Sequence, residues 1–122
     1  MRAGVDVVAV ARLGAALDRT PALLTRVFTP QEVADSTRGG VEHTSIVALR
    51  RLAARFAAKE AARKALDLMR VRWRDLEVRT RPSGAPELWL YGHRAPVALS
   101  LAHDGDVAIA FVVASDPPAQ GV

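Results

Sequence analysis

Residues 55–61 read Arg-Phe-Ala-Ala-Lys-Glu-Ala and lie in the middle of the longest helical pattern of this 122-residue chain. Around them, apolar side chains recur at the three- and four-residue spacing that is typical of the buried face of a helix. These side chains are Ile46, Leu49, Ala53, Phe56 and Ala57. Thr44 or Ser45 can cap the start, and the pattern continues to about Leu68. We therefore predict one long helix that packs on a sheet.

The sequence before this helix predicts a strand and two short helices. Residues 3–10 are rich in valine and contain a single acid, Asp6, a pattern typical of a buried strand. Residues 11–19 support a short helix. Residues 29–32, Thr-Pro-Gln-Glu, form a capping box with proline at the first helical position. A second short helix is therefore expected through about Ser36.

The sequence after the long helix changes to a period of two, which predicts strands. These strands cover residues 76–80, 87–91, 97–101 and 107–113. The turn-forming residues between them favour antiparallel hairpins. The predicted fold class is α+β, with a long helix and shorter helices packed on a mainly antiparallel sheet. One domain is expected over residues 1–114, followed by a flexible C-terminal tail, 115–122.

Composition limits the classes of function. The net charge of +4 and the isoelectric point of 10.6 favour an anionic partner. Cysteine is absent, which excludes disulfides, thiolate catalysis and zinc–thiolate sites. We recognise no signal peptide and no apolar run near the roughly 20 residues that cross a bilayer, so we expect a cytoplasmic protein without membrane contact.

Four basic residues follow one another at four-residue spacing along the predicted helix: Arg51, Arg55, Lys59 and Arg63. Like charges at this spacing repel, so either anions bind along this stripe or it is a solvated basic face. The only two lysines of the chain, Lys59 and Lys64, both lie on this helix. Their placement indicates either that a compact ammonium is needed there or chance.

Two acids are candidates for chemistry. Asp6 lies in an apolar strand, where a carboxylate is costly to bury unless it is paired or binds a metal. Glu60 lies near the edge of the apolar helix face, beside Lys64, and forms either a helix ion pair or a metal ligand. Together the two acids can share a magnesium ion. His103, at a strand end, can reach a phosphate or a reacting hydroxyl, or be merely exposed.

Three motifs occur in a fixed order: Gly4-Val5-Asp6, residues 55–61 with Lys64-Ala65, and Ser100-Leu101-Ala102-His103. In order and spacing they resemble the holo-acyl-carrier-protein synthase family of phosphopantetheinyl transferases, and the resemblance spans nearly the whole chain. The Arg-Phe-Ala-Ala-Lys-Glu run is the most specific of these motifs.

The resemblance implies a magnesium-dependent transfer of 4′-phosphopantetheine from coenzyme A to a serine of apo acyl carrier protein, releasing adenosine 3′,5′-bisphosphate. By residue matching, Asp6 and Glu60 hold magnesium, and Lys64 neutralises phosphate charge or assists the reacting groups. Contacts to coenzyme A are matched by Arg55, Lys64, Pro86 and His103. The base that removes the serine proton is either Glu60 or a metal-bound water.

The resemblance also implies a partner surface and an assembly. The helix after the first strand is basic in the family, which suits an acidic recognition helix of the carrier protein. The matching residues are Arg12, Arg19, Leu23 and Arg26. Similar proteins are homotrimers with active sites at subunit interfaces. Whether the acceptor belongs to fatty-acid or polyketide synthesis is left open.

The chain departs from the family pattern after Ala65, where its loop is shorter, and at Ala85 and Ala102. Arg70, Arg72 and Arg74 in that loop are predicted to compensate by contacting phosphate. Two other functions stay open. One is a non-catalytic relative that binds carrier protein or coenzyme A. The other is a nucleic-acid-binding module, which the scarcity of aromatic residues disfavours.

Overall fold

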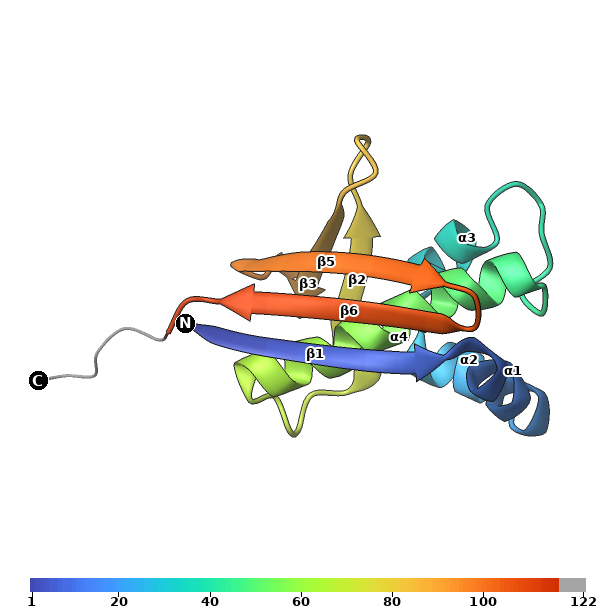
Figure 1. Cartoon of the computed structure of the whole chain (residues 1–122), viewed down its shortest axis with the longest axis horizontal. Helices are drawn as coiled ribbons and strands as arrows, with labels where there is room; N and C mark the ends of the chain where they lie inside the picture. The colour runs from blue at the N-terminus through green and yellow to red at the C-terminus, as the bar shows by residue number, and fades with distance from the viewer. Residues whose placement is uncertain (117–122) are drawn as a thin grey trace, which may run out of the picture.

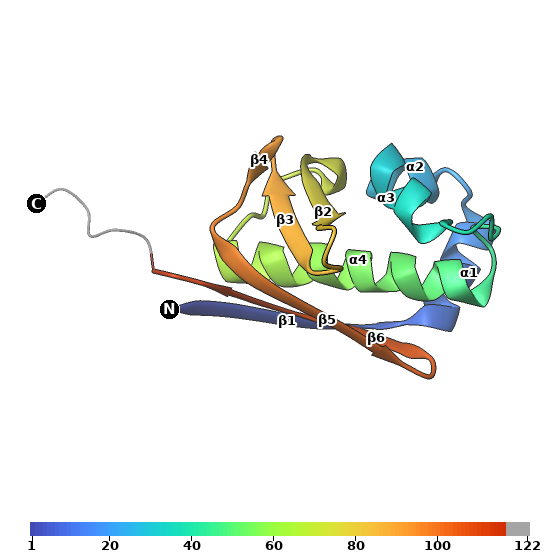
Figure 2. The same cartoon turned by 90° about the horizontal axis from the view of Figure 1, so that it is seen from above.

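Helix α4 (Ile46–Leu66) runs between two layers in the computed structural model, which describes residues 1–116. One layer is a sheet of strands β1 (Arg2–Ala9), β6 (Val107–Ala114) and β5 (Val97–Asp104) (Figure 1). The other contains a second sheet and two of the short helices (Figure 2). The fold is α+β, as predicted, but its strands form two antiparallel sheets rather than one.

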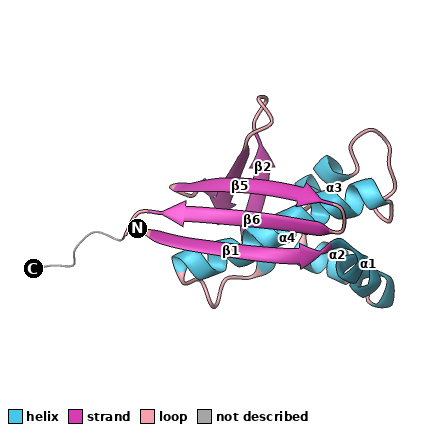
Figure 3. Ribbon diagram, viewed as in Figure 1, coloured by secondary structure: helices cyan, strands magenta, loops and turns pink. Residues whose placement is uncertain are grey.

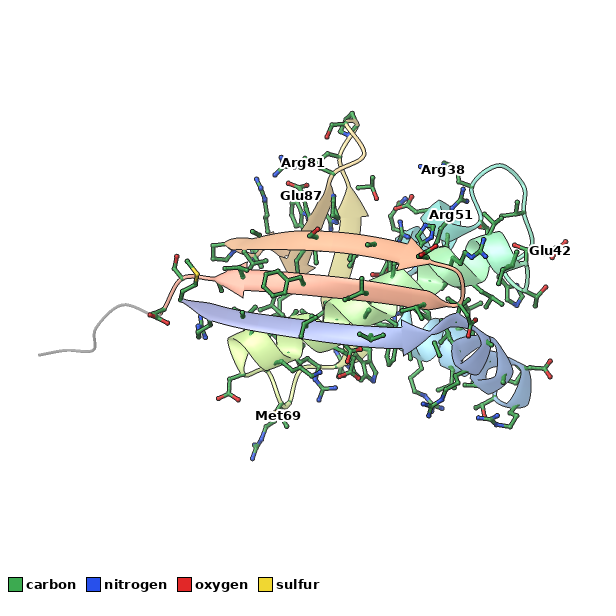
Figure 4. All side chains as sticks on the ribbon, viewed as in Figure 1. Arg38, Glu42, Arg51, Met69, Arg81 and Glu87 are labelled. Atoms are coloured by element: carbon green, nitrogen blue, oxygen red, sulfur yellow. The ribbon has the colours of Figure 1, made fainter. Side chains whose placement is uncertain are left out.

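The second sheet contains β2 (Leu76–Thr80), β3 (Pro86–Leu90) and the short β4 (His93–Arg94), which the sequence analysis did not predict. Its hairpin carries Arg81 and Glu87, which lie side by side (Figure 4). The Glu87 carboxylate forms ion pairs with Arg81 Nε at 2.9 Å and with Arg94 Nε at 3.0 Å. Strand β2 follows the 3-10 turn η1 (Trp73–Asp75).

Three short helices gather at the far end of the molecule from the N-terminus (Figure 3). They are α1 (Val10–Arg19), α2 (Leu23–Val27) and α3 (Pro30–Ser36). The predicted capping box of α3 is confirmed, because Thr29 accepts from the Glu32 amide and Glu32 accepts from the Thr29 amide. Helix α2 was not predicted.

Helix α4 begins at the predicted cap, since the Ser45 hydroxyl accepts from the Ala48 amide at 3.1 Å. Its buried surface is wider than the predicted apolar stripe, because layers pack on both of its sides. Ala48 and Leu52 are fully buried, whereas Ile46 is half-exposed in the first turn. Ile46 was therefore wrongly assigned to the core face.

The valines of β1 predicted a buried strand, but only one of its two faces is buried. Gly4 and Val8 face α4, whereas Val5 and Val7 are 48% and 59% exposed on the opposite face. On the same face, β6 exposes three apolar side chains, Val107, Ile109 and Phe111. We call these five residues the outer sheet face. The error arises because a strand buried on one face and apolar on both has the sequence pattern of a fully buried one.

The basic stripe of α4 lies against this chain's own acceptors, so its interpretation as a solvated basic face was wrong. Lys59 is fully buried; its Nζ donates to Glu32 Oε1 at 2.6 Å, to Val27 O at 2.7 Å and to Trp73 O at 3.1 Å. Burial lowers the pKa of Lys59, and the Glu32 charge opposes that shift.

The two ends of the stripe are bound to backbone carbonyls. Arg51 donates to Ser36 O at 3.2 Å and to Arg38 O at 3.1 Å, in the corner where Figure 4 labels Arg38 and Arg51. Arg63 donates to Leu68 O and Met69 O, both at 3.2 Å. The stripe therefore stabilises the loops on either side of α4.

Most of the predicted C-terminal tail, 115–122, lies outside the described residues. Of its first two residues, Ser115 accepts from the Arg2 guanidinium and Asp116 pairs with the amino terminus. Between residues 1 and 116, no helix combines the length and the apolar character needed to span a membrane.

Candidate active site

A cavity of about 560 Å³ lies between β1, α1, α2 and α4. Asp6 and Glu60 both line it, although they are 54 residues apart in the sequence. The two acids that the sequence analysis singled out are therefore brought together. Arg12, Arg19, Leu23 and Trp73 also line this cavity, which we call the acidic cavity.

Gly4 determines where Asp6 lies. Alternate residues of a strand share a face, so Gly4 and Asp6 both face α4. A Cβ atom at Gly4 would lie 2.0 Å from Ala61 O, so only glycine lets β1 approach the helix this closely. This contact places the Asp6 carboxylate beside the final turns of α4, which carry Glu60 and Lys64. The Gly-Val-Asp motif thus has a packing reason as well as a chemical one.

Lys64 reaches across from α4 to Asp6. Its Nζ donates to Asp6 Oδ1 at 3.1 Å and to Val5 O at 3.0 Å. The predicted helix ion pair between Glu60 and Lys64 is wrong, because Lys64 pairs with the strand instead. Within residues 1–116, the Glu60 carboxylate forms no ion pair. The Lys64 ammonium is therefore held against Asp6, while Glu60 lines the same cavity as Asp6 without an ion-pair partner among these residues.

The donor set suits a hard divalent cation. In the described part of the chain, no cluster of three or more His, Cys, Asp and Glu side chains is arranged to hold a metal. Two carboxylates on one cavity leave most coordination positions for water and substrate oxygens. Magnesium is bound by proteins in this manner, whereas a closed zinc site needs more protein ligands. Asp6 and Glu60 therefore fit the predicted magnesium site.

The predicted partner residues divide between two neighbouring hollows. Arg12 and Arg19 on α1 and Leu23 on α2 line the acidic cavity, and both arginines are exposed. Arg26 opens instead into an adjacent pocket. Three of the four residues thus surround the carboxylates.

None of the four predicted coenzyme A contacts lines the acidic cavity of its own chain, although Lys64 binds the Asp6 carboxylate. Arg55 is 8% exposed, and its Nη1 donates to Arg51 O at 3.1 Å. Burial lowers the pKa of Arg55 against the opposing charges of Asp35 and Glu32. Pro86 begins β3 in the second sheet. His103 is exposed near the end of β5, which β6 separates from β1.

Sequence reasoning missed the aromatic wall of the cavity. The rings of Phe56 and Trp73 lie 5.2 Å apart between centroids, and both line the acidic cavity. Phe56 had been assigned to the core, and Trp73 had received no role. Behind this wall, Lys59 binds the carbonyls of Val27 and Trp73. The isolated lysine in an arginine-rich chain was the available signal for this buried contact.

Comparison with known proteins agrees with this geometry. The family model described as ACPS, 4′-phosphopantetheinyl transferase superfamily, matches residues 2–112. The holo-[acyl-carrier-protein] synthases of Beutenbergia cavernae and Frankia alni are each 46% identical to this chain over 121 residues. Each alignment covers 91% of this chain, and 94% and 93% of the two relatives, respectively.

Solved structures are similar over the same length. Holo-[acyl-carrier-protein] synthase from Neisseria meningitidis aligns with a TM-score of 0.76 at 28% identity, covering 94% of this chain and 98% of that one. The Helicobacter pylori enzyme in complex with coenzyme A aligns with a TM-score of 0.74 at 28% identity, covering 93% and 99%. The fold and the family match thus define a phosphopantetheinyl transferase. Within that class, the chain belongs to the holo-[acyl-carrier-protein] synthase family.

Proposed function

We propose that this protein transfers 4′-phosphopantetheine from coenzyme A to a serine of apo acyl carrier protein, with magnesium. The observation that carries this proposal is one cavity that is lined by two carboxylates and by a basic rim of Arg12 and Arg19, with Lys64 bonded to the Asp6 carboxylate. The carboxylates and lysine suit a diphosphate substrate, and the basic rim suits an acidic protein partner. Membership of the family supports the same reaction.

In this reaction the serine Oγ forms a bond to the β-phosphorus of coenzyme A. The bond from that phosphorus to the bridging oxygen breaks, and adenosine 3′,5′-bisphosphate leaves with the electron pair. Asp6 and Glu60 would hold magnesium, which when bound neutralises diphosphate charge and orients the transferring group. Lys64, already 3.1 Å from Asp6, would place its ammonium beside the phosphate oxygens.

The serine proton needs an acceptor near the β-phosphate. We propose Glu60 for this role, directly or through one water, because its carboxylate lines the cavity without an ion-pair partner in residues 1–116. Asp6 and Glu60 would both hold magnesium, and Glu60 would in addition accept the proton, because Asp6 is already engaged by Lys64.

Completion of the coenzyme A site requires a neighbouring chain. We propose a homotrimer, in which Pro86 and His103 of one subunit border the acidic cavity of the next. The apolar outer sheet face supports this assembly, because exposed apolar patches commonly mark protein interfaces. Arg55 stays a candidate contact, since its Nε donor has no hydrogen-bond partner within residues 1–116.

The carrier protein would dock over α1 and α2. Arg12, Arg19 and Arg26 offer positive charge, and Leu23 offers an apolar contact, to an acidic helix that carries the serine nearby. Opposite charge speeds such an encounter and fixes its orientation. We propose the cytoplasm as the location, where the sequence analysis had placed the protein.

The test is release of adenosine 3′,5′-bisphosphate, followed by chromatography, when the protein is mixed with coenzyme A, magnesium and apo acyl carrier protein. We expect one product molecule per carrier, and loss of the product with a chelator. Asp18→Asn, on an exposed acid of α1 outside the acidic cavity, serves as the control and should retain activity. Tight carrier binding without any product would instead identify a non-catalytic relative.

A further inference from the structure

A second hollow, of about 690 Å³, adjoins the acidic cavity. Trp73 lines both hollows. Four arginines line the second one: Arg26 from α2, Arg63 from α4, and Arg72 and Arg74 at the turn η1. No aspartate or glutamate lines it among the described residues. We call this hollow the arginine pocket.

The charges in the arginine pocket are largely uncompensated. Arg63 is held by two backbone carbonyls, and its guanidinium lies 4.4 Å from the centroid of the Trp73 ring. These contacts fix the position of Arg63, but none of them is with a carboxylate that would neutralise its positive charge. Arg72 Nε pairs with the Asp75 carboxylate at 3.3 Å, although the Arg72 side chain is 87% exposed.

The remaining two arginines, Arg26 and Arg74, are exposed and form no ion pair with any residue from 1 to 116. Four guanidinium groups therefore line one hollow that no carboxylate lines among the described residues, and Asp75 pairs with one of the four, Arg72. Such a cluster attracts anions, because its positive potential is focused by the pocket. The guanidinium fork matches carboxylate and phosphate geometry better than a lysine does.

The position of the arginine pocket decides between coenzyme A phosphate and an acidic protein segment as its anion. The sequence analysis had assigned Arg72 and Arg74, with Arg70, to phosphate contacts of coenzyme A. In the structure Arg72 and Arg74 line the same pocket as Arg26, which neither Asp6 nor Arg70 lines. Arg26 belongs to the proposed carrier-docking surface. A protein that docks on α1 and α2 would therefore continue across this pocket.

We propose that the arginine pocket binds a second acidic segment of the carrier protein, beyond the helix that contacts Arg12, Arg19, Leu23 and Arg26, with Arg26 at the junction of the two segments. This inference rests on the proposed function. Arg63 and Trp73 form the fixed floor of the pocket, and Arg72 and Arg74 are its exposed, adjustable contacts. The pocket thereby adds affinity for the acceptor without touching the reacting groups.

The test compares Arg72→Ala/Arg74→Ala with the wild-type protein in steady-state transfer. We expect the KM for the carrier to rise about threefold to tenfold, as removal of two exposed charge contacts allows. The KM for coenzyme A and the kcat should not change. The rise should shrink at high salt, because exposed charge pairs are screened.

The matched control is Arg38→Ala/Arg94→Ala, which removes the same charge from exposed positions outside the pocket and should leave the carrier KM within twofold of wild type. An increase confined to the coenzyme A KM would overturn the proposal in favour of a nucleotide phosphate. Unchanged constants for both substrates would overturn it in favour of a solvated cluster.

Direct binding separates this proposal from the proposed function. If the wild-type protein binds apo carrier but transfers nothing, the function fails while the pocket can still be tested. In that case Arg72→Ala/Arg74→Ala should weaken carrier binding, measured by calorimetry, and Arg72→Lys/Arg74→Lys should restore part of it. Equal affinities of all three proteins would contradict the pocket alone.

Discussion

Gly4 and Ala61 are in contact where strand β1 crosses α4, and the position of the Asp6 carboxylate depends on this contact. An added Cβ at position 4 would lie 2.0 Å from the Ala61 carbonyl oxygen and 3.0 Å from the Ala65 amide nitrogen. Both are backbone atoms that cannot rotate away. The strand or the helix has to move instead.

Gly4→Ala should therefore destabilise the protein by about 3 kcal/mol, the upper range for forced overpacking. Urea unfolding measures this loss. Gly14→Ala is the control, because its added Cβ would meet only the flexible Leu49 side chain, at 3.1 Å. It should change stability by less than about 1 kcal/mol. Equal effects of the two substitutions would contradict the packing role of Gly4.

At the level of single residues, the sequence predicted the chemistry better than the environment. Asp6, Glu60 and Lys64 were recognised by their motifs, and the structure brings them to one place. The burial of Lys59, in the basic stripe of α4, was not predicted, because the periodicity of a helix does not show which groups pack against each of its faces. Its partner, Glu32, had been recognised only as a helix cap.

The buried pair Lys59–Glu32 joins α4 to α3, and its further hydrogen bonds reach α2, η1 and β2. Glu32 Oε2 also accepts from the Val78 amide at 2.9 Å, so the carboxylate is fully engaged. Removal of one partner would leave the other charge buried without compensation, which costs far more than the intact pair contributes.

We expect Lys59→Met to lower the free energy of unfolding by about 3–5 kcal/mol. The double variant Lys59→Met/Glu32→Gln should recover part of that loss, because no charge is then left alone. Lys64→Met, on the same helix, breaks a more exposed pair and should cost less than about 1 kcal/mol. Urea unfolding of the four proteins gives these values. Similar losses from the two lysine variants would rule out a special role for the buried pair.

Strand β2 carries an acid whose ionisation is coupled to folding. Burial alone would raise the pKa of Glu77, but hydrogen bonds from Thr29 and Arg79 hold it below its ordinary value of 4.5. A carboxyl group with a lowered folded pKa adds stability above its ordinary value. That stability is lost as the pH falls from 4.5 through the folded pKa.

Glu77→Gln should thus lower the melting temperature near pH 7, and this difference from wild type should shrink as the pH falls below 4.5. The effect should stay under about 1 kcal/mol, because the carboxylate is partly solvated. Thermal unfolding across this pH range measures it. A difference that grows in acid would contradict the assigned sign.

At the level of elements, the two capped helices, α3 and α4, and every strand except β4 were predicted to within a few residues. Their partition into two sheets was not, because pairing of β1 with β6 joins residues more than 90 positions apart. Local periodicity contains no information on such distant pairing. The width of the buried surface of α4 was underestimated for the same reason, since both layers contribute to it.

The whole molecule presents an apolar outer sheet face on β1 and β6, with Phe111 45% exposed. A homotrimer would bury this face and would bring the neighbour's Pro86 and His103 to the acidic cavity. Trimer formation and activity should consequently be lost together.

Phe111→Glu should shift the protein from trimer to monomer in sedimentation velocity and reduce transfer at least tenfold. Met69→Glu is the control, because Met69 is 71% exposed in the loop after α4, away from this face (Figure 4). It should leave both assembly and activity unchanged. An active monomeric Phe111→Glu protein would show that one chain holds a complete site.

The central claim is that Asp6 and Glu60 support transfer of phosphopantetheine to a carrier protein. The most direct measurement is the intact mass of apo acyl carrier protein after incubation with this protein, coenzyme A and magnesium. We predict a gain of one phosphopantetheine with the wild-type protein, and no gain with Asp6→Asn, with Glu60→Gln or with a chelator. An unchanged carrier mass with the wild-type protein, or full modification by either variant, would contradict the account.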